Sequence, residues 1–140
     1  MIKITINAEA LTMNMLYPTN KTGRRFLSKK GSDFKKIVSI ETKKAMLGSG
    51  FTFNPETHYT SSEIFIYTPR LVTKAGKLSK IKPDTSNCIK ALEDAVFESL
   101  GIDDMHNLDV SASANYSENP TIVFIVRKHL LSSKFDTINN

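Results

Sequence analysis

The pattern of hydrophobic and polar residues predicts regular elements along most of the chain. Isoleucines alternate with polar residues from Ile2 to Ile6, which is the period of a strand with one buried face. A helix is expected to begin at a cap on Ser28 or Ser32 and to end near Leu47, before Gly48-Ser49-Gly50. Its expected inner residues are Phe34, Ile37, Val38, Ile40, Thr42 and Ala45. A strand is expected over residues 62–68, which are rich in β-branched and aromatic side chains.

A second helix is expected between Pro83 and Gly101. Proline disfavours helical geometry in the residue before it, so this helix begins at or after Pro83, and Gly101 ends it. Its apolar stripe consists of Ile89, Leu92, Val96 and Leu100, with Ala95 beside them. The opposite row consists of Asp84, Asn87, Lys90 and Asp94. Residues three or four apart are neighbours on one helix face, so this polar row is a candidate site.

Two more strands are expected after this helix, and together the elements define a fold class. They cover about residues 109–116 and 121–126, and the second, the most hydrophobic run, is expected to be central. The order strand, helix, strand, helix, strand, strand predicts an α+β fold with one mixed sheet and packed helices. We expect a single domain over residues 1–128, which is long enough to bury a core, and a frayed tail over residues 129–140.

The distribution of charge points to a phosphate-bearing partner. The chain has 19 lysines and arginines against 14 acidic residues, a net charge of +5. Basic residues concentrate over residues 21–36 and 70–82, whereas carboxylates gather over residues 84–109. A basic surface beside an acidic pocket is typical of an enzyme that binds phosphates and cuts one of them with a metal. The single Cys88 fits a reducing cytoplasm, and no apolar run is long enough to suggest a membrane partner.

Carboxylates flank both ends of the second helix, with Asp84 at its start and Asp103-Asp104 beyond its end. That helix is about 20 Å long at 1.5 Å per residue, so Asp84 and Asp104 meet only if the chain returns along it. If they meet, their oxygens form a Mg²⁺ or Mn²⁺ site, and Lys90 neutralises charge on the reacting phosphate. The structural alternatives are an N-cap for Asp84, a solvated loop for Asp103-Asp104 and a surface ion pair for Lys90.

The same residues resemble the signature of a known family. The segment Pro83-Asp84-x-x-Asn87-x-x-Lys90-Ala91-x-x-Asp94-Ala95, followed by Gly101-Ile102-Asp103-Asp104, resembles the motif of the RusA-type Holliday-junction resolvases. The segment with Asn14, Tyr17 and Gly23-Arg24-x-Phe26-Leu27-Ser28, and the later strand from Pro120 to Val126, are also similar to that family. The resemblance covers most of residues 2–127.

The resemblance implies a homodimeric endonuclease that depends on Mg²⁺, with Mn²⁺ as a substitute, and nicks two opposing strands of a four-way DNA junction. By this resemblance Asp84 and Asp104 match the catalytic metal-binding aspartates, and Lys90 matches the catalytic lysine. The supporting positions are Asn87, Asp94 and Asp103. The expected DNA-binding residues are Asn14, Arg24, Arg25, Lys77, Lys80 and Lys82. A two-fold symmetric protein can present two such sites to a two-fold symmetric junction.

One residue departs from the family pattern. The family's second aspartate, two positions after the first, is Ser86 in this chain. A hydroxyl can hold a metal-bound water, but the lost negative charge lowers the expected metal affinity. Glu93 is not expected to replace it, because Glu93 projects from a different helix face than Asp84. Three functions stay open: a junction-cutting nuclease, a junction-binding protein that cuts poorly, and an unrelated basic domain.

Overall fold

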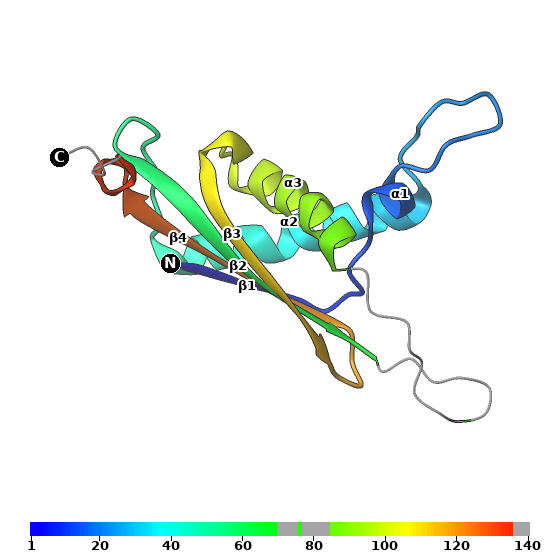
Figure 1. Cartoon of the computed structure of the whole chain (residues 1–140). Helices are drawn as coiled ribbons and strands as arrows, with labels where there is room; N and C mark the ends of the chain where they lie inside the picture. The colour runs from blue at the N-terminus through cyan, green and yellow to red at the C-terminus, as the bar shows by residue number, and fades with distance from the viewer. Residues whose placement is uncertain (70–75, 77–84, 136–140) are drawn as a thin grey trace.

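The computed structural model describes residues 1–69, 76 and 85–135. The helices and strands are β1 (Ile2–Ile6), α1 (Met13–Leu16), α2 (Lys29–Ser49), β2 (His58–Thr68), α3 (Ser86–Leu100), β3 (Asn107–Tyr116) and β4 (Thr121–Leu130). Two 3₁₀ turns, η1 (Asp104–His106) and η2 (Leu131–Lys134), complete the described chain. The strands form one four-stranded sheet in the order β1-β4-β2-β3, and the helices lie on one face of it (Figure 1). The predicted α+β fold and the central position of β4 are confirmed.

The sheet buries the side chains that alternate along its strands and face the helices. β1 pairs antiparallel with β4, so that Ile2 lies opposite Val126 and Ile6 opposite Ile122, and all four are fully buried. β4 also pairs antiparallel with β2, whereas β2 and β3 are parallel. Parallel neighbours need a crossover connection, and α3 supplies it between β2 and β3. The crossover brings η1, which follows α3, to the beginning of β3.

α2 begins after Ser28, the first of the two predicted caps, whose hydroxyl accepts a hydrogen bond from the Gly31 amide at 2.9 Å; the helix ends at Ser49, two residues beyond the expected Leu47. The buried residues of α2 are Gly31, Phe34, Val38 and Thr42. The prediction that Ile37 and Ile40 face inward is wrong, because they are 38% and 53% exposed. The buried residues of α2 form a narrow row with spacings of three, four and four, and both isoleucines project beside that row.

α3 has the bounds expected from the sequence, and Gly101 ends it with a φ angle of +71°. Its buried residues are Cys88, Ala91, Leu92, Ala95, Val96, Phe97 and Leu100. The ring of Phe97 meets that of Phe124 in β4 edge to face, with 6.5 Å between centroids. This packing fixes the rotation of α3 about its own axis, so that the polar row with Lys90 and Asp94 lies away from the core.

Other boundaries differ from the sequence prediction. β2 begins at His58 rather than residue 62, and α1 was not expected at all. β4 continues to Leu130 and η2 follows, so the tail expected to fray from residue 129 is strand and 3₁₀ turn through Lys134. The extra length arises because His58 pairs with Leu130 across the sheet, a contact that local periodicity does not reveal. Within the described residues no helix combines the length and apolar character needed to cross a bilayer.

Candidate active site

A polar cluster surrounds the ammonium group of Lys90 on α3. Its Nζ lies 2.8 Å from Oδ1 of Asp94, one turn further along the helix. The same Nζ lies 2.9 Å from Oδ2 of Asp104, which belongs to η1. After Gly101 the chain turns back toward α3 (Figure 1), far enough for Asp104 to reach Lys90. We call Lys90, Glu93, Asp94 and Asp104 the Lys90 cluster.

The turn that presents Asp104 is stabilised by Asp103. The Asp103 side chain accepts a hydrogen bond from the Met105 amide at 3.0 Å, and its carbonyl accepts one from the His106 amide at 3.1 Å. Asp103 therefore caps η1 and orients Asp104 through the backbone. In the structure its contacts are local, whereas the Asp104 carboxylate reaches Lys90.

Electrostatics in the Lys90 cluster follow from these contacts. The hydrogen bond from Lys90 lowers the pKa of Asp104, because the ammonium stabilises the ionised carboxylate. Conversely, the hydrogen bonds to Asp94 and then Asp104 raise the pKa of Lys90. Lys90 is 60% exposed, so solvent weakens each attraction. The three carboxylates outnumber the single ammonium, so the cluster is acidic overall.

Behind the Lys90 cluster lies a buried hydrogen-bond chain that sequence reasoning missed. The Glu93 side chain is 15% exposed, and its Oε1 lies 4.0 Å from the Lys90 ammonium. Asn107 at the start of β3 donates from Nδ2 to Oε2 of Glu93 at 3.3 Å. Asn107 Oδ1 in turn accepts hydrogen bonds from the Thr60 and Ser62 hydroxyls of β2, both at 3.0 Å. Burial raises the pKa of Glu93, and the bond from Asn107 opposes that rise.

One sequence signal could have found Glu93, namely its position three residues after Lys90. Helical spacing sets Glu93 apart from Asp84, but its neighbours in the structure are Lys90 and Asn107. Asn107 had no such signal, because its partners Thr60 and Ser62 come from a distant strand.

The remaining residues of the expected site fall in two groups. Ser86 and Asn87 are exposed on the first turn of α3, ahead of Lys90. Asp84, Lys77, Lys80 and Lys82 lie outside the described residues, so the pairing of Asp84 with Asp104 stays a prediction. Among the residues that the structure describes, no three His, Cys, Asp or Glu side chains are placed to hold a metal ion. The donor chemistry nevertheless fits Mg²⁺ or Mn²⁺, because Asp104 and Glu93 offer carboxylate oxygens.

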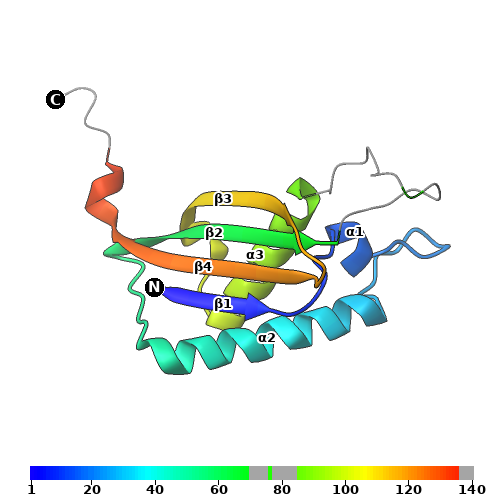
Figure 2. The ribbon, with the colours of Figure 1, turned by 90° about the horizontal axis from the view of Figure 1, so that it is seen from below.

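Residues 18–27, which we call the basic arm, project from the body at the end where α3 begins (Figures 1 and 2). Asn20 organises the tip: its Oδ1 accepts hydrogen bonds from the amides of Thr22 and Arg24. Gly23 has a φ angle of +83°, which the tight turn requires and other residues rarely adopt. The tip therefore keeps a defined shape while the Arg24 side chain stays exposed.

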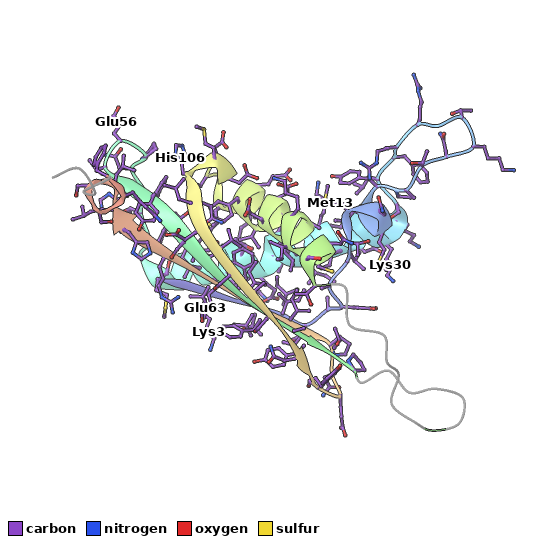
Figure 3. The ribbon with its side chains drawn as sticks, viewed as in Figure 1. Lys3, Met13, Lys30, Glu56, Glu63 and His106 are labelled. Atoms are coloured by element: carbon purple, nitrogen blue, oxygen red, sulfur yellow. The ribbon has the colours of Figure 1, made fainter. Side chains whose placement is uncertain are left out.

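The base of the basic arm joins two of the expected DNA-binding residues. Arg25 donates from Nη2 to Oδ1 of Asn14 at 3.0 Å and from Nε to the Tyr17 carbonyl at 3.2 Å. The Tyr17 hydroxyl accepts a hydrogen bond from Lys35 of α2 at 3.0 Å, which raises the pKa of that lysine. Figure 3 shows Met13 and Lys30 beside this base, where α1 meets α2. The structure thus brings Asn14 and Arg25 together, with Arg24 beyond them at the tip.

A comparison with protein families agrees with this geometry. The family model described as endodeoxyribonuclease RusA matches residues 12–127, which include both the Lys90 cluster and the basic arm. A comparison with curated proteins found no match. RusA-family resolvases generally depend on a divalent metal, which the carboxylates of the Lys90 cluster suit. The matched region covers most of the 140 residues, so the chain belongs to the RusA endodeoxyribonuclease family, whose members hydrolyse DNA to resolve Holliday junctions.

Proposed function

We propose that this chain is a Mg²⁺-dependent endonuclease, with Mn²⁺ as a substitute, that resolves four-way DNA junctions by paired nicks in opposing strands. The Lys90 cluster carries the proposal. It joins an aspartate and a lysine from separate segments at 2.9 Å on the outer face of α3. A purely structural ion pair needs one carboxylate, whereas this lysine is surrounded by three.

The residues have distinct roles in this proposal. Asp104, together with Asp84, would hold the divalent cation. When bound, that cation supplies charge neutralisation at the scissile phosphate and lowers the pKa of a coordinated water. Lys90 places a positive charge beside Asp104, where it can stabilise charge that develops on a phosphate oxygen. Asp94 orients the ammonium from the other side and favours its ionised form.

Binding of the junction is assigned to the basic arm and its surroundings. Arg24 and Arg25, with Asn14, would contact the DNA backbone from the arm, because guanidinium groups bind phosphate in a bidentate manner. Lys77, Lys80 and Lys82 are assigned the same role from their sequence positions alone. Phosphate contacts of this kind release counterions, so binding should weaken steeply as salt rises.

We assign the sheet face opposite the helices to a second copy of the chain. Phe65, Val123 and Ile125 are half-buried there, and no element within the described residues covers them. Figure 3 shows Lys3 and Glu63 pointing from this face away from the helices. A lysine and a glutamate therefore lie beside an apolar centre on this face, which suits a self-complementary two-fold contact.

Sedimentation equilibrium should report a dimer, and Val123→Asp should shift it to monomer. A monomeric native chain would contradict this assignment.

The decisive experiment is incubation with a labelled synthetic four-way junction in Mg²⁺, in Mn²⁺ and in EDTA. A linear duplex of the same sequence and the variant Asp104→Asn serve as controls. We expect paired nicks that require metal, occur only on the junction and vanish in the variant. Tight junction binding without nicks would contradict the nuclease proposal.

Ser86 favours a second candidate, a junction-binding protein that cuts poorly. This residue is exposed on the first turn of α3, where the family pattern has an aspartate. The variant Ser86→Asp separates the candidates in the same junction assay. Cleavage should rise sharply if the native chain lacks an essential charge, and should change little if the native chain is already an active nuclease.

A further inference from the structure

We propose that Glu93, held in place by Asn107, supplies the acidic charge that the family pattern places at position 86. This inference rests on the proposed function, because it concerns cation binding at the same site. Glu93 is a positioning residue here: it sets the charge and the geometry around Asp104 and Lys90. The proposal explains how a site with a serine at that position can still attract a divalent cation.

The first support is the place of the Glu93 carboxylate. It is only 15% exposed, yet it faces the polar side of α3 and lies 4.0 Å from the Lys90 ammonium. The same ammonium lies 2.9 Å from Oδ2 of Asp104, so Glu93 and Asp104 share Lys90 as a neighbour. Glu93 is therefore a third carboxylate on the side of the cluster nearest the sheet, with Asp94 and Asp104 on the exposed side.

The second support is that the side-chain amide of Asn107, which donates to Glu93, has only one favourable orientation. Asn107 is nine-tenths buried, and its Oδ1 accepts from two hydroxyl groups, those of Thr60 and Ser62. Reversing the amide would turn its oxygen toward the Glu93 carboxylate, so Nδ2 faces Oε2 as found. Two residues of the central sheet thus fix Asn107, and Asn107 fixes Glu93.

The third support is the unfavourable free energy of burying the Glu93 carboxyl group and the Asn107 amide. Burying a carboxyl group and an amide in the layer between helix and sheet is unfavourable unless both are satisfied. A surface ion pair with Lys90 does not need that burial, because Asp94 already provides one at 2.8 Å. The buried chain instead holds a negative charge at a defined position beside Asp104, which a cation site requires.

The test measures Mn²⁺ binding to the full chain by isothermal titration calorimetry, without DNA. Glu93→Gln keeps the shape and the hydrogen bond from Asn107 and removes only the charge. We expect it to weaken Mn²⁺ binding at least about tenfold, because one charge near a divalent cation contributes that much or more at the effective dielectric constant of a protein surface. Ser86→Asp in the Glu93→Gln background should restore the binding. Glu98→Gln, an exposed site on the same helix, is the matched control and should leave binding unchanged.

The outcomes separate this inference from the proposed function. Equal Mn²⁺ affinity in the native chain and Glu93→Gln overturns the inference while the metal-dependent nuclease stands. A similar loss in Glu98→Gln also overturns it, because the effect would then reflect net charge alone. A native chain that binds no Mn²⁺ and makes no nicks overturns both. Thermal unfolding of each variant confirms that the comparison is made between folded proteins.

Discussion

The Lys90 cluster and the basic arm carry opposite charge and are supported in different ways. In the cluster, side chains from α3 and η1 meet within 3 Å of one ammonium, and buried residues of the sheet support them from behind. In the arm, one asparagine and a glycine turn shape the tip, and the Arg24 side chain extends from it into solvent. The cluster depends on tertiary packing, whereas the arm depends on local backbone geometry.

The two regions are therefore suited to control different properties of the enzyme. Chemistry at a phosphate requires groups placed within a fraction of an ångström, and only a packed scaffold provides that. Binding to a charged backbone requires mainly exposed positive charge, which tolerates small displacements. Variants of the cluster should therefore change the rate of cleavage, and variants of the arm should change affinity.

The largest effect is expected for Asp104→Asn. Cleavage of a four-way junction at saturating protein should fall about a thousandfold or more, because charge stabilisation of several kcal/mol is lost with the metal. Junction affinity in EDTA should not weaken, since the variant removes a negative charge. A gel-shift titration and a single-turnover assay measure the two quantities. An equal loss of junction affinity and of cleavage rate would contradict the assignment of chemistry to the Lys90 cluster and of binding to the basic arm.

The next effect is expected for Lys90→Met, which keeps most of the unbranched side chain and removes its charge. Single-turnover cleavage should fall about a hundredfold, the usual size for one electrostatic contact to a reacting phosphate. Lys90→Arg should recover only part of the rate, because a planar guanidinium does not reproduce an ammonium held between two carboxylates. Full activity in Lys90→Met would assign the lysine a purely structural role.

A smaller effect, on stability, is expected for Gly31→Ala where α1 packs on α2. An added Cβ would lie 2.9 Å from the Leu16 carbonyl oxygen and 3.0 Å from its Cδ2. The free energy of unfolding should fall by about 1–3 kcal/mol, as overpacking typically costs. Gly48→Ala is the control, because its Cβ meets nothing within 4 Å and should stabilise the helix slightly. Urea denaturation compares them, and equal stabilities would mean that α1 moves freely on α2.

The smallest effect is expected for the double variant Arg24→Ala, Arg25→Ala in the basic arm. Junction affinity should fall, and the slope of log affinity against log salt should become shallower by about two units for two lost phosphate contacts. Cleavage at saturating protein should stay close to native. Lys44→Ala, which removes an exposed charge paired with Glu41 on α2, is the control. An unchanged salt slope would remove the arm from the DNA interface.

Much of the fold was determined by local sequence features. Ser28 and Gly101 bounded the two long helices, because caps and left-handed glycines act through their own backbone neighbours. Alternating isoleucines marked β1, and the apolar run after Pro120 marked the central strand β4. The short α1 and the first residues of β2 escaped prediction, because tertiary contacts hold them in place.

The candidate site was determined only in part by the sequence. The row of Lys90 and Asp94 follows from helical spacing, and the ion pair at 2.8 Å confirms it. Only the tertiary structure brought Asp104 back to Lys90, since the β2–α3–β3 crossover decides where the chain goes after Gly101. The contact of Glu93 with Asn107 likewise needed β3 to lie beside β2. Periodicity reports which face of an element is buried, but the packing of elements distant in sequence decides which polar groups meet.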